Sequence, residues 1–174
     1  MMRDWKSILT WSGLGSFIGF AIAVALYSPT GSENFIYLIY AGMLLGAFLG
    51  FRHPLETRAA AYSFPLGFLV TSMLAGLWMV RDVKPDEVYI FLAAVMVTLV
   101  LIESRNFLDM FLVPLTYFGG FAVAMLVFKG YQPLQRTEGA VTSLFVVGVM
   151  GAILAFFAVF ARWTFTKAKN IPRR

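Results

Sequence analysis

The chain of 174 residues contains no cysteine and a single histidine, His53. Without thiols it can form no disulfide, bind no metal through thiolate and use no cysteine nucleophile. One histidine also falls short of the paired histidines that an intramembrane metalloprotease or a histidine-rich metal site needs. We therefore expect the protein to hold neither a metal ion nor a cofactor.

Charge is also scarce, because Asp, Glu, Lys and Arg make up 13% of the sequence and hydrophobic residues 60%. A soluble domain is about 45–50% apolar and about 25% charged, so a water-soluble fold would expose too much apolar surface. The long apolar runs also lack acidic residues and histidine near their middles. Proton-coupled pumps and acid–base catalysts need such groups, so the sequence argues against a pump and against an enzyme.

What the sequence does contain is six apolar runs, each close to the about 20 residues that a helix needs to cross a bilayer. The strands of a membrane barrel would alternate apolar and polar residues, and these runs do not alternate. Short linkers leave no room for a soluble domain. The predicted fold is all-α, a single polytopic transmembrane domain over residues 1–174, built as a compact six-transmembrane-helix bundle with spans at 7–27, 35–51, 59–80, 87–102, 107–128 and 139–161.

The basic residues predict how the bundle is oriented. With the N-terminus inside, the inner segments hold ten of them, and the outer segments hold four, which are Arg81, Lys84, Lys129 and Arg136. The positive-inside rule then places both termini on the cytoplasmic side of a plasma or inner membrane. The formal charge of +5 is therefore a topology signal, and we expect no nucleic acid among the partners of this chain.

Small residues recur at helical spacing in the first two spans. Gly42, Gly46 and Gly50 share one face of the second span, and Gly15 and Gly19 lie on a small-residue face of the first. Such faces let two helix backbones touch, so the first interpretation is packing between these two spans. The alternative is a face for self-association or for another membrane subunit.

The third and fifth spans carry prolines, Pro65 and Pro114, each of which removes one backbone hydrogen bond. Kinked helices with freed carbonyls line the pathway in some transporters and are also common in ordinary bundles. Hydroxyl groups on the same helices suit a neutral or weakly polar solute rather than a metal ion. The candidate pathway residues are Ser63, Pro65, Thr71, Ser72, Pro114, Thr116 and Tyr117.

Charged residues gather in two turns that the predicted orientation places in the cytoplasm, one between the second and third spans and one between the fourth and fifth. They predict a cytoplasmic gate or a docking rim. The alternative is a set of interfacial anchors that add little stability. The residues concerned are Arg52, His53, Glu56, Arg58, Glu103, Arg105 and Asp109.

Two further hypotheses concern the whole chain. Residues 17–23 resemble residues 118–124, which suggests three helical-hairpin repeats of about fifty residues. The leading hypothesis for function is a small permease, channel or transporter subunit, which predicts a cavity between the third and fifth spans. The alternative is a structural or assembly subunit of a larger membrane complex, which predicts a filled interior and an exposed small-residue stripe on the first or second span.

Overall fold

The computed structural model describes residues 5–55, 57–81, 83–101, 107–128 and 140–169. All regular structure in these ranges is helical, and no strand occurs among them. The elements are α1 (Trp5–Thr30), the 3₁₀ helix η1 (Glu33–Tyr37), α2 (Leu38–Arg52), α3 (Arg58–Val80), α4 (Pro85–Leu101), α5 (Asp109–Phe128) and α7 (Ala140–Lys169). The predicted all-α fold class is confirmed.

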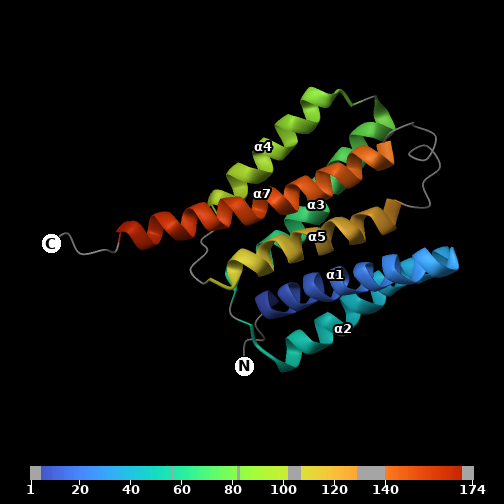
Figure 1. The fold of residues 1–174 in the computed structure, drawn as a ribbon, viewed down its shortest axis with the longest axis horizontal. Coiled ribbons are helices and arrows are strands. Elements are labelled where there is room, and N and C mark those ends of the chain that lie inside the picture. The colour runs from blue at the N-terminus through green and yellow to red at the C-terminus, as the bar shows by residue number, and fades with distance from the viewer. Residues whose placement is uncertain (1–4, 56, 82, 102–106, 129–139, 170–174) are drawn as a thin grey trace.

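Helix α5 forms the centre of the bundle, and α1, α3 and α7 all pack against it (Figure 1). Helix α2 packs on α1 and α4 packs mainly on α7, so these two helices form opposite flanks. The start of α1 and the end of α7 lie at the same end of the bundle, which we call the terminal end. The turns from α1 to α2 and from α3 to α4 lie at the opposite end.

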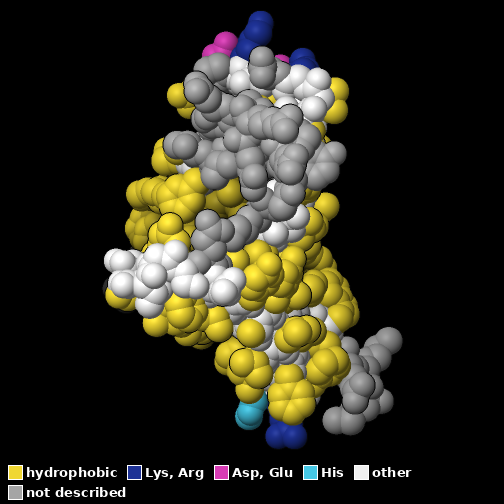
Figure 2. Space-filling model, turned by 90° about the vertical axis from the view of Figure 1, so that its right-hand side faces the viewer, with side chains coloured by type: hydrophobic (Ala, Val, Ile, Leu, Met, Phe, Trp, Pro, Cys, Tyr) yellow, Lys and Arg dark blue, Asp and Glu magenta, His cyan; other side chains and the backbone are white. Residues whose placement is uncertain are grey.

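Within the described ranges, five helical segments are long and apolar enough to cross a bilayer, namely α1, η1 joined to α2, α3, α5 and α7. Helix α4 has 17 residues, so at 1.5 Å per residue it spans about 25 Å of the about 30 Å hydrocarbon core. Hydrophobic side chains cover most of the described surface in Figure 2, and charged side chains lie at its top and bottom edges. The chain is thus a multi-pass helical membrane protein, in which α4 corresponds to the shortest apolar run.

Helix α7 departs most from its predicted span. The prediction ended at residue 161, whereas the helix continues to Lys169 and has 30 residues. At 1.5 Å per residue it is about 45 Å long, which exceeds the hydrocarbon core. Figure 1 shows its last turns running past the ends of the neighbouring helices. Apolar composition ends at Arg162, but nothing in residues 162–169 breaks a helix, since the segment lacks Gly and Pro.

Helices α1 and α2 form a hairpin in which the two backbones touch. A Cβ atom built on Gly15 would lie 2.0 Å from the Gly42 carbonyl oxygen, and one built on Gly42 would lie 2.1 Å from the Gly15 oxygen. Cβ atoms built on the other three glycines of the two faces would also lie too close to the backbone of the opposite helix. The distances are 2.2 Å for Gly19, 2.0 Å for Gly46 and 2.6 Å for Gly50. The small-residue stripes of the first two spans are therefore covered within the chain, and the exposed stripe that the assembly hypothesis predicted is not found there.

The three hairpins are not packed alike. The α1–α2 pair is in close contact along its length, but α4 turns away from α3 and lies mainly against α7. In the turn after α1, Gly31 adopts a positive φ of 63° and its N–H donates to the Tyr27 carbonyl oxygen at 2.8 Å. The proposed internal repeat stays a prediction.

Candidate functional site

Helix backbones also touch where α1, α3 and α5 meet, at a place that we call the three-helix junction. A Cβ atom on Gly119 would lie 2.1 Å from the Gly13 carbonyl oxygen, which puts α5 directly on α1. A Cβ on Gly67 would lie 2.1 Å from the Tyr117 oxygen, and one on Gly120 would lie 2.0 Å from the Phe64 oxygen. Helices α3 and α5 therefore meet backbone to backbone, and no side chain fits between them at these points.

Ser63 of α3 and Thr116 of α5 form a hydrogen bond across this contact, and both side chains are fully buried. Each hydroxyl also lies within bonding distance of its own helix: Ser63 Oγ is 2.9 Å from the Ala60 carbonyl oxygen and Thr116 Oγ1 is 2.8 Å from the Leu112 oxygen. Because each hydroxyl has one proton, one of them donates to the other while the second donates to a carbonyl. The pair thus joins α3 to α5 deep inside the bundle.

Pro65 and Pro114 flank this pair in sequence, and both helices continue through their prolines without a break. Each proline leaves without its usual helical partner the carbonyl four residues earlier, at Ala61 and Met110. The two hydroxyls lie within bonding distance of neighbouring carbonyls instead, as given above. The prolines therefore lie next to the junction, where their rings are partly buried.

The other predicted pathway residues do not join the Ser63–Thr116 pair. Thr71 is buried and donates to the Gly67 carbonyl oxygen of its own helix at 2.7 Å. Ser72, one residue further, is turned about 100° around the helix, and its buried Oγ has no hydrogen-bond partner. The structure thus brings Ser63 and Thr116 together and points Ser72 in another direction.

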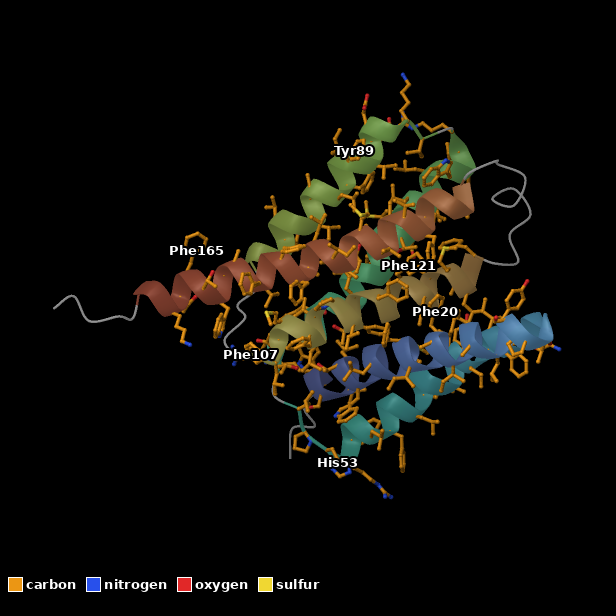
Figure 3. All side chains as sticks on the ribbon, viewed as in Figure 1. Phe20, His53, Tyr89, Phe107, Phe121 and Phe165 are labelled. Carbon is orange, nitrogen blue, oxygen red and sulfur yellow. The ribbon has the colours of Figure 1, made fainter. Side chains whose placement is uncertain are left out.

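Tyr117 faces α7, where two glycines make room for aromatic rings of α5. A Cβ on Gly151 would lie 2.5 Å from the Tyr117 hydroxyl oxygen, and one on Gly148 would lie 2.5 Å from the Phe121 ring. Figure 3 shows Phe121 lying between α5 and α7. The Tyr117 hydroxyl is buried and has no hydrogen-bond partner. The ring is therefore held by shape rather than by hydrogen bonding.

The predicted charged rim is spread over different environments. Arg52, His53 and Arg58 are exposed at the terminal end, where His53 projects from the end of α2 (Figure 3). Asp109 is buried, with 2% of its surface exposed, in the first turn of α5, where a carboxylate interacts favourably with the helix dipole. Glu56, Glu103 and Arg105 lie outside the described residues.

A hydrogen-bonded clamp that the sequence did not reveal holds the turn between α2 and α3. The Leu55 N–H donates to Ser7 Oγ at 2.8 Å, and Ser7 Oγ lies 3.3 Å from the Leu55 carbonyl oxygen. Trp11 Nε1 donates to the His53 carbonyl oxygen at 2.9 Å. Ser7 and Trp11 are four residues apart, so they share one face of α1. That spacing was visible in the sequence, but the partner segment was not.

The sequence signal for the three-helix junction was present but interpreted differently. Ser63, Gly67 and Thr71 recur every four residues on α3, and Thr116, Gly120 and Ala124 do so on α5. These are small-residue faces of the type that lets helices touch. Because Ser63, Thr71 and Thr116 carry hydroxyls, the two sets are equally compatible with a solute pathway, and the spacing alone does not distinguish the two interpretations.

The residues described in the structure contain no group of three or more His, Asp or Glu side chains that could hold a metal ion. The site is therefore a packed junction of small and hydroxyl side chains, and the turn between α2 and α3 is held separately by hydrogen bonds with α1. Together with the fold, it defines the protein as a multi-pass helical membrane protein. Neither the family models, the curated proteins nor the solved structures compared with this chain give a match.

Proposed function

We propose that the chain is a non-enzymatic membrane protein that works as a structural or assembly subunit within a larger membrane complex. The observation that carries this proposal is the closed contact between α3 and α5. The helices expected to line a solute pathway touch through Gly67 and Gly120, and the candidate hydroxyls Ser63 and Thr116 bond each other. A filled interior is what an assembly subunit needs.

Helix α4 is the flank that we assign to a partner. The described part of α4, Pro85–Leu101, is about 25 Å long and shorter than the hydrocarbon core. Short helices reduce such a mismatch by associating with other helices. The outward side of α4 exposes Ala93 and Ala94, which are small enough for a second helix to approach closely. Tyr89 and Ile90, each 68% exposed, would frame such a contact. Within the chain, α4 leans mainly on α7 and leaves this side uncovered.

We also infer that the terminal end faces the cytoplasm of a plasma or inner membrane. The support is the distribution of basic residues along the sequence, ten in the predicted inner segments against four in the predicted outer segments. A protease-protection assay on sealed vesicles with a tag after residue 174 tests the orientation, since a cytoplasmic tag in right-side-out vesicles resists added protease. Cleavage of the tag in intact right-side-out vesicles would contradict it.

A second candidate is a permease for a neutral or weakly polar solute, and one observation favours it. Ser63 and Thr116 place two hydroxyl groups between proline-bearing helices inside the bundle. If α3 and α5 separate during a transport cycle, these hydroxyls would line the opening. The permease therefore requires movement at the contact, whereas the assembly subunit requires none.

A cross-link between α3 and α5 separates the two functions. The chain has no cysteine, so Ser63→Cys with Thr116→Cys creates a single defined disulfide across the junction after oxidation. For an assembly subunit, the oxidised variant runs in the same high-mass complex as wild type when native membranes are solubilised mildly and separated by native electrophoresis. Ser63→Cys alone, treated with the same oxidant, is the matched control.

Uptake of urea and glycerol is then measured by light scattering of proteoliposomes that contain the same double-cysteine variant. If the chain is an assembly subunit, the proteoliposomes should shrink and regain their volume no faster than empty vesicles do, whether the disulfide is oxidised or reduced. Uptake that disappears on oxidation and returns on reduction would replace the assembly proposal with the permease. A wild-type chain that migrates alone after mild extraction from its own membrane would also overturn assembly.

A further inference from the structure

Three basic side chains at the terminal end are each placed over an aromatic ring. Arg52 lies 4.7 Å from the centre of the Phe48 ring, Lys167 lies 4.6 Å from the Trp163 ring, and Lys6 lies 5.8 Å from the Trp5 ring. The pairs belong to the end of α2, the end of α7 and the start of α1. Figure 1 places these three helix ends at the same end of the bundle.

The spacing within each pair sets the depth of its two members. Phe48 and Arg52, like Trp163 and Lys167, are four residues apart, so ring and cation lie on the same helix face about 6 Å apart along the axis. In both pairs the cation follows the ring and is therefore nearer to the helix end and to water. Aromatic rings prefer the boundary between acyl chains and headgroups, which places Arg52 and Lys167 at the level of the phosphates. Lys6 follows Trp5 directly at the start of α1, so it lies at nearly the same depth as its ring.

The opposite end of the bundle is built differently. There Arg81 forms an ion pair with Glu87 at 2.8 Å, and the first turn of α4 contains both Asp86 and Glu87. By contrast, Lys6, Arg52 and Lys167 have no carboxylate within ion-pair distance among the residues that the structure describes. At one end a protein carboxylate balances Arg81, and at the other Lys6, Arg52 and Lys167 lie over aromatic rings.

We propose that these three pairs form a binding ring for the headgroups of anionic phospholipids. The argument is charge complementarity: three cations near the membrane surface, each over an aromatic ring and without a carboxylate partner among the described residues, fit a lipid that carries net negative charge. A zwitterionic lipid adds a positive group beside its phosphate and fits less well. The ring acts in either function considered above, because lipid binding requires neither a partner subunit nor a pathway.

The ring is tested by native mass spectrometry of the purified full chain in mild detergent. Phosphatidylglycerol and phosphatidylcholine with identical acyl chains are added in equal amounts, and the ratio of the two bound lipids is measured. A basic residue near anionic lipid contributes about 1 kcal/mol, which is about fivefold in relative affinity. We expect wild type to prefer phosphatidylglycerol and each of Lys6→Gln, Arg52→Gln and Lys167→Gln to lower the preference by about fivefold.

Lys84→Gln is the matched control, because Lys84 is exposed at the opposite end and should leave the preference unchanged. Trp163→Leu keeps Lys167 but removes its ring, so it should reduce the preference if ring and cation act as a pair. Helix content by circular dichroism checks that every variant is folded. Equal binding of both lipids by wild type, or an equal loss in Lys84→Gln, would overturn the proposal.

A further arm separates a lipid site from a site for free phosphate. Glycerol 3-phosphate in hundredfold excess presents the same anionic group without acyl chains. If the ring recognises lipid, the bound phosphatidylglycerol remains in place, since the acyl chains contribute to its retention. Complete displacement by the soluble compound would show that the ring takes a soluble phosphate, and the lipid proposal would then be wrong.

Discussion

Replacing Gly67 with alanine tests the closed contact between α3 and α5 most directly. The added Cβ would lie 2.1 Å from the Tyr117 carbonyl oxygen, whereas ordinary van der Waals contact begins at 3.4 Å. The difference of these two values is 1.3 Å, and the two backbones must separate by about that much because neither can rotate away. A gap of 0.5–1 Å already costs about a quarter to a half of the dispersion energy at each contact.

Overpacking of this kind costs about 1–3 kcal/mol in soluble cores. The same separation also stretches the Ser63–Thr116 hydrogen bond, and such bonds inside membrane proteins contribute about 0.6–2 kcal/mol. We therefore expect Gly67→Ala to lower the free energy of unfolding by about 2–5 kcal/mol. Unfolding by sodium dodecyl sulfate in mixed micelles, followed by loss of helix signal, measures this value.

Gly76→Ala on the same helix is the control, because a Cβ at that position meets nothing within 4 Å. Alanine is the better helix former by about 1 kcal/mol in water, so this variant should be as stable as wild type or slightly more stable. If Gly67→Ala and Gly76→Ala unfold at the same detergent fraction, the backbones of α3 and α5 do not touch, and the main support for the assembly proposal is lost.

Three further predictions concern polar side chains. A double-mutant cycle with Ser63→Ala and Thr116→Ala should give a coupling energy of about 0.6–2 kcal/mol in the same unfolding assay, and a value near zero would mean that the hydroxyls do not bond each other. Tyr117→Phe removes a buried hydroxyl that has no partner, so stability should stay equal or rise by about 1–3 kcal/mol, and a clear loss would reveal a missing partner. Ser7→Ala removes the acceptor of the Leu55 N–H, so limited proteolysis should cut the turn after α2 faster than in wild type, and an unchanged rate would show that the clamp is dispensable.

The fold class followed from the sequence because bilayer physics leaves few choices. Runs of about 20 apolar residues without charge must form helices in lipid, since each backbone polar group has to be bonded within its own segment. Helix α7 continues past its predicted span because hydropathy reports where the apolar part stops, and a helix can extend beyond it into the headgroup layer. Residues 162–169 contain neither of the residues, Gly and Pro, that would have ended it.

The position of α4 could not have been derived from the same pattern. Its apolar residues face both its neighbours and the lipid, and lipid tails are as apolar as a protein core, so amphipathicity does not distinguish the two sides. Whether α4 follows α3 as a hairpin or crosses to α7 depends on which helix offers the better surface. That information lies in the partner helix rather than in α4 itself.

The candidate site shows how one spacing supports two interpretations. On α1 and α2 the residues at four-residue spacing are mostly glycine, which can only be a packing face. On α3 and α5 the same spacing mixes glycine with Ser63 and Thr116, whose hydroxyls are compatible with a solute pathway. The physical distinction is whether the hydroxyls find each other or water, and that depends on the distance between two segments 53 positions apart, which no local pattern records.

The distance is set by the glycines, and this links the packing of the junction to the function that we propose. Gly67 and Gly120 hold α3 and α5 so close that Ser63 and Thr116 lie within hydrogen-bonding reach of one another. A hydroxyl that bonds another side chain is no longer available to replace water around a solute. A permease using these residues would have to break the hydrogen bond and separate the backbones in every cycle, whereas an assembly subunit keeps both contacts. The closed contact between α3 and α5 therefore favours a rigid bundle. In such a bundle the flanking helices α2 and α4 contact lipid and partner helices.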